Sequence, residues 1–256
     1  MSKPFFVLST GSFAPPAFYD NLVDRLGENG YEMKVLHLPS VGRAAGEGRD
    51  TPPGTMYEDA ALIAKEVEAL ADAGKEVILV AHSYGGMPAT ESTKGLSVQE
   101  RLKQGKKGGL VRLAYKTVLL TNPGHSASDV LGTPPFQPDE NGWLHMPDDL
   151  EISAATCFSD LPREEGVLLA AQFALHSAVS FTNSLTHAGY KDVPVSYLVC
   201  EKDLIISPDV QRKGIDMIEA ETGSKVDVTS IDAGHCPTGS MLDTVVEWLV
   251  GVARRS

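Results

Sequence analysis

One serine in this chain stands in a context that can make its hydroxyl group a nucleophile. Ser83 follows the apolar run 77–80, which is typical of a strand buried on both faces, and a segment compatible with a helix begins near Met87. Ala81 and Gly85 supply small residues two positions before and after it, where larger side chains would collide in a sharp strand-to-helix turn. The pattern predicts a nucleophilic serine at the carboxyl edge of a sheet, rather than a serine that caps an ordinary helix.

A serine that attacks an acyl group requires a histidine to take its proton and a carboxylate to orient that histidine. Asp203 and His235 follow the predicted strands 195–200 and 226–231, so both lie at the sheet edge that carries Ser83. The chain order serine, acid, histidine is one of those found in known triads. Because a glycine precedes His235, its loop is free to aim the imidazole. We predict that these three residues form a catalytic triad.

Other acidic residues and histidines are less suitable candidates. Asp232 is an alternative orienting carboxylate, but it is too near His235 in the sequence to face its ring easily. Turn or capping roles are the alternative for three acids: Asp203, Glu201 and Asp209. His82 adjoins Ser83 and points away from its hydroxyl in such a turn, so we expect it to shape the turn at most. The other histidines are expected to be ordinary core or surface groups: His37, His125, His145, His176 and His187.

The elements that must position these residues alternate along the chain between strand-like and helix-like patterns. We expect strands at 5–9, 33–38, 77–80, 117–121, 195–200 and 226–231, and helices at 22–28, 57–73 and 241–252. Gly74 stands where a glycine ends a helix. The alternation predicts an α/β fold, with a mostly parallel twisted sheet flanked by helices.

Three stretches depart from this alternation. Residues 39–54 are rich in Gly, Pro and Arg and are expected to form a surface loop, and the basic stretch 101–112 is expected to be a solvated connection. Residues 124–190 contain no convincing core strand, begin with turn-rich sequence, and are helical in pattern from 163 to 178. We therefore predict a core of residues 1–123 and 191–256 with a helical lid, 124–190, inserted after the strand that leads to Asn122.

Charge and cysteine content narrow the class of protein. The net charge of −12 and the pI of about 5.0 argue against nucleic acid or an anionic membrane surface as a partner, because an acidic protein repels both. The three cysteines are widely spaced and form no Cys-x-x-Cys pair, so we expect neither a zinc site nor a disulfide framework. A reducing, cytoplasmic setting is the expectation.

No cofactor or targeting segment is expected either. The apolar run after Pro4 is too short for a signal peptide and fits a first strand better, and no stretch has the length of a membrane span. The glycines at 105–109 lack the spacing of a phosphate-binding loop, and no dinucleotide fingerprint follows the first strand.

Over nearly its whole length the chain resembles the α/β-hydrolase superfamily, and within it the small esterase and hydroxynitrile lyase group typified by plant methyl-ester hydrolases. The segment from Gly11 to Phe13 stands where that group has its His-Gly-x oxyanion loop. The resemblance implies that the backbone N–H of Ser12 is one oxyanion donor, beside the N–H of Tyr84 at the start of the helix. Asp203 to Pro208 resembles the group's acid loop, and residues 234–235 its base loop. The stretch from 82 to 122 also looks like hydrolases found in fungal genomes.

Three positions depart from the group. Thr10 replaces the histidine usual before the oxyanion glycine. The lyases have a threonine at the position of Gly11 and a lysine at that of Cys236, which they need for the cyanohydrin hydroxyl and for cyanide. These differences argue against cyanohydrin cleavage.

The residues and the resemblance together predict a serine hydrolase that cleaves a carboxylic ester, lactone or thioester of a small hydrophobic molecule through an acyl-enzyme. Six apolar residues are candidate substrate-binding residues, with plain lid core as the alternative: Phe13, Trp143, Phe158, Leu161, Phe173 and Phe181.

Other reactions remain open with the same triad, because the fold does not fix the reaction. A lyase, or an acyltransferase or cyclase of natural-product metabolism, is the main alternative, and product analysis distinguishes it from a hydrolase. A non-catalytic small-molecule receptor is disfavoured, because all three triad members are present. We expect a monomer or a homodimer.

Overall fold

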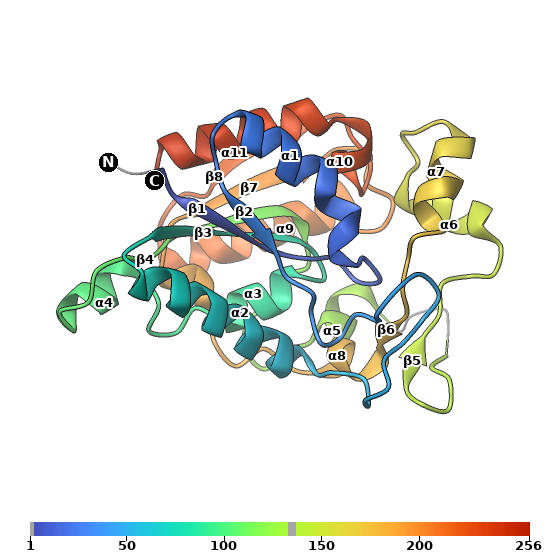
Figure 1. Cartoon of the computed structure of the whole chain (residues 1–256), viewed down its shortest axis with the longest axis horizontal. Coiled ribbons are helices and arrows are strands. Elements are labelled where there is room, and N and C mark those ends of the chain that lie inside the picture. Colours follow the sequence, from blue (N-terminus) through green and yellow to red (C-terminus); the bar gives the residue numbers. More distant parts are fainter. Residues whose placement is uncertain (1–2, 133–136) are drawn as a thin grey trace.

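A six-stranded parallel sheet runs through the centre of the computed structural model, which describes residues 3–132 and 137–256 (Figure 1). Its strand order is β2-β1-β3-β4-β7-β8. The strands are β1 (Phe5–Ser9), β2 (Met33–Val35), β3 (Glu76–Ser83), β4 (Gly109–Val118), β7 (Val195–Cys200) and β8 (Asp227–Ile231). The order reverses between β1 and β3, and ligands of open α/β sheets bind outside the carboxyl ends of strands at such a point.

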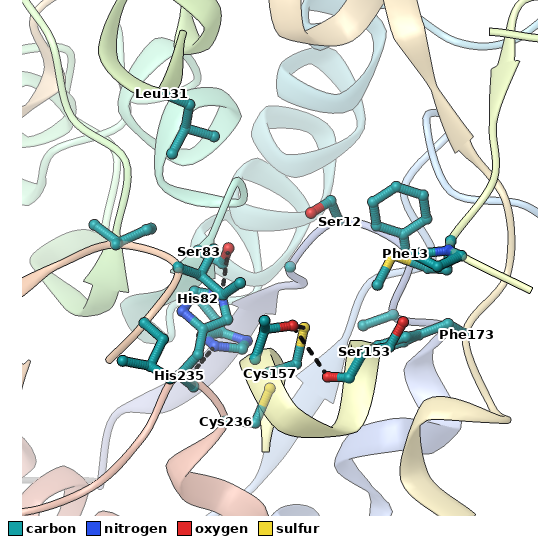
Figure 2. Close-up of a pocket in the computed structure, with 18 of the residues that line it drawn as sticks. Ser12, Phe13, His82, Ser83, Leu131, Ser153, Cys157, Phe173, His235 and Cys236 are labelled. Carbon is teal, nitrogen blue, oxygen red and sulfur yellow. Dashed lines mark hydrogen bonds between the residues drawn. The ribbon is translucent and has the colours of Figure 1, made fainter. Parts of the chain in front are cut away.

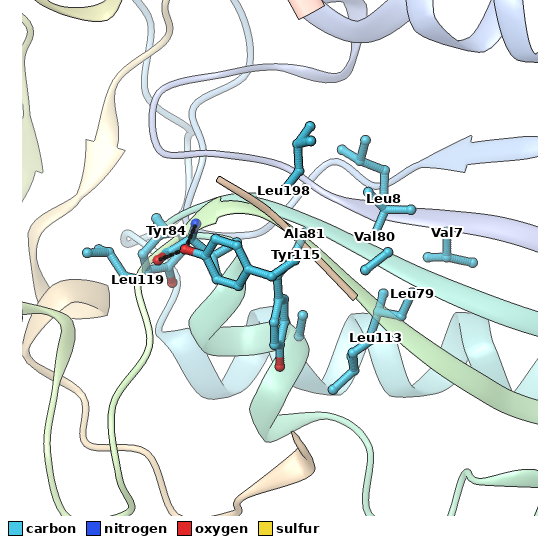
Figure 3. Packing of buried hydrophobic residues seen from close by; sticks show 14 of the residues in the cluster. Val7, Leu8, Leu79, Val80, Ala81, Tyr84, Leu113, Tyr115, Leu119 and Leu198 are labelled. Carbon is cyan, nitrogen blue, oxygen red and sulfur yellow. Dashed lines mark hydrogen bonds between the residues drawn. The ribbon is translucent and has the colours of Figure 1, made fainter. Parts of the chain in front are cut away.

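The central strands are buried on both faces, as their continuous apolar runs predict. All of Val77 to Ala81 in β3 are at most 1% exposed. Figure 3 shows Val7 and Leu8 of β1 packed near Leu79 and Val80 of β3. The rigid centre of the sheet therefore holds the loops after β1 and β3 in place.

Helices cover both faces of the sheet (Figure 1). The helices α1 (Asp20–Glu28) and α11 (Leu242–Arg254) lie on one face, and α2 (Met56–Asp72) and α3 (Gly86–Glu91) on the other. The remaining helices outside the segment between β4 and β7 are η1 (Pro16–Tyr19), α4 (Val98–Lys103), α9 (Pro208–Thr222) and α10 (Pro237–Ser240). Within the described residues, no helix combines the length and the apolar character that crossing a membrane would require.

Helix α2 shows how local sequence sets an element. Thr55 and Glu58 form a capping box, in which the Glu58 N–H donates to the threonine hydroxyl over 3.2 Å and the Thr55 N–H donates to the glutamate over 2.7 Å. The helix then buries Met56, Ala60, Ile63, Val67 and Ala71 along one face. Gly74, predicted as the terminating glycine, has a φ of 80°.

The described residues between β4 and β7 contribute no strand to the main sheet. They form α5 (Ala127–Leu131), β5 (Trp143–Leu144), α6 (Leu150–Cys157), α7 (Arg163–Ala170), β6 (His176–Ser177), α8 (Ala178–Thr182) and η2 (Gly189–Lys191). Helices α6 and α7 pack together to one side of the sheet (Figure 1). The position agrees with an insertion, while the function of 124–190 as a lid stays a prediction.

Several predicted boundaries are corrected by the structure. The strand expected at 117–121 is β4, which begins at Gly109 and ends at Val118, so part of the basic stretch 101–112 is strand. Arg101 within that stretch is buried, because its guanidinium donates to Asp72 over 2.6 Å and to the Gly108 carbonyl over 3.1 Å. The strand at 33–38 ends at Val35, and the helical pattern at 163–178 ends at Ala170.

Candidate active site

The turn that carries Ser83 is as tight as its small residues suggest. Ser83 is the last residue of β3 and has a φ of 55°, a left-handed conformation that non-glycine residues adopt only when their surroundings enforce it. A Cβ atom on Gly85 would lie 2.5 Å from the carbonyl oxygens of Ser9 and Thr10. The strand-to-helix turn therefore requires glycine here, and it presents the serine at the end of the sheet.

Replacing Gly85 by alanine is expected to lower the free energy of unfolding by about 1–3 kcal/mol, because a methyl group would be forced against backbone. Urea denaturation measures the change. Gly27→Ala is the matched control: nothing lies within 4 Å of the added Cβ, and alanine favours a helix by up to about 1 kcal/mol. Equal stability of the Gly85 variant and the natural chain would contradict this account of the turn.

Ser83, His235 and Asp203 form a hydrogen-bonded line at the carboxyl ends of β3, β8 and β7. His235 Nε2 lies 2.9 Å from Ser83 Oγ, and His235 Nδ1 lies 2.8 Å from Asp203 Oδ2. All three residues are at most 6% exposed. The arrangement has the geometry in which a histidine can take a serine proton while a carboxylate stabilises the resulting imidazolium.

Asp203 is held as a carboxylate by several donors. Its Oδ1 accepts the N–H groups of Ile205 at 2.7 Å and Ile206 at 2.9 Å, and its Oδ2 also accepts the hydroxyl of Thr117. Burial acts to raise the pKa of Asp203, but the neighbouring His235 and these hydrogen bonds outweigh it and lower the pKa below its ordinary value. Thr117 has a φ of 40°, and no pattern in the sequence predicts its contact with Asp203.

The alternative acids lie elsewhere. Asp232 is exposed and pairs with Lys202 at 2.7 Å. Glu201 pairs with Arg212 at 2.5 Å, and Asp209 lies in the first turn of α9. Among the described residues, Asp203 is therefore the carboxylate that contacts the His235 ring.

The two predicted oxyanion donors lie on loops that flank Ser83. Within the described residues, neither the Ser12 N–H nor the Tyr84 N–H donates to a protein acceptor. The amides on either side of Ser12 are engaged: the Gly11 N–H donates to the Tyr19 hydroxyl at 3.1 Å, and the Phe13 N–H donates to His176 Nδ1 at 3.4 Å. Two N–H groups thus remain able to stabilise a negatively charged oxygen.

A cavity of about 750 Å³ opens over Ser83 and His235 (Figure 2). Apolar side chains form most of its wall, including Phe18, Leu119, Met146, Ile152 and Ile205. Apart from His235 and His82, the titratable groups in the described wall are His145, Asp148, Cys157 and Cys236, and the wall contains neither lysine nor arginine. The cavity suits a neutral, hydrophobic small molecule.

A family model described as "Alpha/beta hydrolase family" matches residues 6–248. The chain belongs to this family. Two relatives from fungi match over almost the whole chain. "Probable hydrolase R7" of Phoma sp. is 37% identical over 245 residues, which cover 94% of each chain. "Alpha/beta hydrolase nvfD" of Aspergillus novofumigatus is 28% identical over 258 residues, covering 99% of this chain and 98% of the relative.

Solved structures agree on the fold of this α/β-hydrolase. A pyrethroid hydrolase from Sphingobium faniae superposes with a TM-score of 0.76 at 24% identity, covering 99% of this chain and 98% of the other. The methylesterase MES16 from Arabidopsis gives a TM-score of 0.69 at 18% identity, covering 99% and 100%. The predicted fold class and the resemblance to the esterase-like group are thereby confirmed, and the chain is a hydrolase of the α/β-hydrolase type.

The six predicted pocket residues of this hydrolase divide into two sets. Phe13, Phe173 and Phe181 line the cavity. The other three lie outside its described wall: Trp143, Phe158 and Leu161. Phe158 is 2% exposed and stacks 5.7 Å from Phe173, so it supports the wall from behind. Trp143 borders a separate polar hollow beside residues 43–53.

His82 shapes the site without contacting the Ser83 hydroxyl. Its Nε2 lies 2.9 Å from the backbone carbonyl of His235, so that nitrogen donates, and its Nδ1 accepts the Tyr19 hydroxyl at 2.8 Å. Complete burial lowers the pKa of His82 and keeps the ring neutral. The ring thus links the serine turn to the backbone of the His235 loop.

Two buried thiols in the cavity wall are expected to be unreactive. Burial raises the pKa of Cys157 to about 11 and that of Cys236 well above its ordinary value, and the thiolate is the reactive form. Iodoacetamide near neutral pH should therefore leave Cys157 and Cys236 of the folded chain unmodified, while the unfolded chain is alkylated at both positions. Rapid alkylation of Cys157 or Cys236 in the folded chain, detected by mass spectrometry, would contradict this expectation.

Proposed function

We propose that the protein hydrolyses a carboxylic ester, lactone or thioester of a small hydrophobic molecule, with Ser83 as nucleophile, His235 as base and Asp203 as its orienting acid. One observation carries the proposal: the Ser83 Oγ lies 2.9 Å from His235 Nε2 at the base of a largely apolar cavity. A serine hydroxyl is a weak nucleophile until such a base is aligned with it.

The reaction follows from the contacts. His235 Nε2 takes the Ser83 proton as Oγ bonds to the acyl carbon, and the N–H groups of Ser12 and Tyr84 hold the oxyanion. When the intermediate collapses, the bond to the alcohol or thiol breaks and His235 protonates that leaving group. Water, deprotonated by His235, then attacks the acyl-enzyme, which releases the carboxylic acid and restores Ser83.

The cavity wall supports a substrate without negative charge. Asp148 is the acidic side chain of the described wall, and that wall contains no lysine or arginine that would offset its charge. Three partly exposed apolar side chains line the cavity: Leu131, Ile152 and Leu204, which are 41%, 53% and 64% exposed. An apolar substrate group that extends out of the cavity can therefore contact these side chains. In this proposal residues 124–190 supply the lid side of the pocket.

A panel of p-nitrophenyl esters tests the proposal, with unsubstituted acyl chains compared to matched chains that end in a carboxylate. We expect kcat/KM to be higher for the neutral esters by about tenfold or more, which corresponds to a free-energy difference of roughly 1.4 kcal/mol or more. A free acid must be the product. Preference for the anionic esters would contradict the assigned substrate class, and a carbon–carbon cleavage or ring-closure product from a physiological ester would favour a lyase or cyclase.

A further inference from the structure

His176, which we had expected to be an ordinary core group, contacts both loops that carry the candidate oxyanion donors. It belongs to β6 in the inserted segment and is 0% exposed. Its ring centroid lies 5.4 Å from that of Phe13 and 4.7 Å from that of Tyr84. Phe13 follows Ser12, and Tyr84 bears the other N–H. A single side chain therefore joins the two halves of the oxyanion hole.

The hydrogen bonds around His176 determine which of its ring nitrogens carries the proton. The Ser180 hydroxyl donates to the Ser177 carbonyl at 2.8 Å, so its oxygen accepts from His176 Nε2 at 3.1 Å. The proton of the neutral ring then sits on Nε2, and Nδ1 accepts the Phe13 N–H at 3.4 Å. Burial lowers the pKa of His176 to about 3, which keeps Nδ1 an acceptor at ordinary pH.

The backbone of Phe13 depends on this support. Its φ of 64° is unfavourable for a residue with a side chain and persists only where neighbours enforce it. The Phe13 carbonyl accepts the Ala174 N–H at 2.8 Å, so Ala174 and His176 hold both polar backbone groups of Phe13. On the other side of Ser12, the Gly11 N–H is held by Tyr19. Ser12 thus lies between two anchored amides, next to the cavity with Ser83 and Phe13 (Figure 2).

We propose that His176 is a positioning residue, which fixes the loop of Ser12 through the Phe13 N–H so that the inserted segment completes the oxyanion hole. This inference rests on the proposed function. The Phe13 N–H needs a neutral hydrogen-bond acceptor at the position of His176 Nδ1. Loss of this acceptor weakens stabilisation of the transition state rather than binding of the ester.

Two variants of similar size distinguish the role of the hydrogen-bond acceptor on His176 from the role of its side-chain volume. In His176→Asn the side-chain oxygen can occupy the place of Nδ1, whereas His176→Leu offers no acceptor. For a neutral p-nitrophenyl ester we expect kcat of the leucine variant to fall by about 10- to 100-fold with KM nearly unchanged, since complete loss of an oxyanion donor costs about 10²–10³. The asparagine variant should keep kcat within about fivefold, because the acceptor remains. Inhibition by a trifluoromethyl ketone, whose serine adduct carries an oxyanion, should weaken in parallel with kcat.

Equal kcat values for the two variants, or a loss that appears in KM alone, would overturn the inference. If the leucine variant does not fold, Ser180→Ala replaces it, because it removes the acceptor that fixes the His176 tautomer. We expect a loss of kcat of about threefold or more, the effect of weakening a hydrogen bond by roughly 0.7 kcal/mol or more, and an unchanged kcat would overturn the inference. If instead the proposed function is wrong, the natural chain itself will hydrolyse no ester of the panel, which distinguishes that outcome from failure of the inference about His176.

Discussion

Replacing Ser83 by alanine is expected to lower kcat by about 10⁴-fold or more, with little change in KM. The reason is that the covalent route is lost when its nucleophile is removed, while the cavity and the N–H groups that bind the ester remain. Residual turnover would come from the oxyanion hole and substrate binding alone. Steady-state kinetics with a neutral p-nitrophenyl ester measure the effect.

Ser12→Ala is the matched control, because Ser12 lines the same cavity but is proposed to act through its backbone N–H, which alanine retains. Its kcat should stay within about threefold of that of the natural chain, since its hydroxyl is assigned no role in the transition state. Undiminished kcat in a folded Ser83→Ala protein would require another nucleophile or a reaction without an acyl-enzyme.

Replacing Asp203 by asparagine is expected to lower kcat by about 10⁴-fold, although the side chain keeps its shape. The N–H groups of Ile205 and Ile206 both point at Oδ1, so an asparagine must place its oxygen there and its NH₂ group toward His235. His235 Nδ1 then accepts a hydrogen bond, and the proton moves to Nε2. With that tautomer the ring cannot take the proton of Ser83.

Asp232→Asn is the control for the orienting acid, because Asp232 is near His235 in sequence but pairs with Lys202 on the surface. We expect its kcat to remain within about twofold, as is usual for exposed ion pairs worth less than roughly 1 kcal/mol. Circular dichroism establishes that both variants are folded. The reverse pattern, a large loss at Asp232 and a small one at Asp203, would reassign the acid.

The positions of the candidate triad residues could be predicted because each is marked by the sequence immediately around it. Ser83 is marked by small neighbours that a tight turn demands, and Gly85 has no space for a Cβ atom. Asp203 and His235 follow strands that pair in parallel, and parallel pairing brings their ends to one edge of the sheet. The sheet itself follows from apolar runs such as 77–80, whose length and composition match strands buried on both faces.

The pocket could be predicted only in part, because its wall is made by tertiary contacts. Phe158 and Phe181 both lie in the inserted segment, yet Phe158 packs against Phe173 and Phe181 reaches the cavity. Nothing in their spacing distinguishes the two. His176 has the sequence context of a core histidine, and its contact with Phe13, 163 positions away, exists only in the folded chain. The early start of β4 was missed because basic residues and glycines suggested a loop, while burial of Arg101 depends on Asp72 from α2.

The most direct test of the central claim is labelling of the folded protein with a fluorophosphonate probe, which reacts with an activated serine hydroxyl. We predict that the natural chain is labelled at Ser83, that Ser83→Ala is not labelled, and that His235→Ala is labelled far more slowly, because the base that activates the hydroxyl is absent. Equal labelling of the natural chain and Ser83→Ala, or no labelling of the natural chain under conditions where it is folded, would contradict the assignment of Ser83 as the nucleophile.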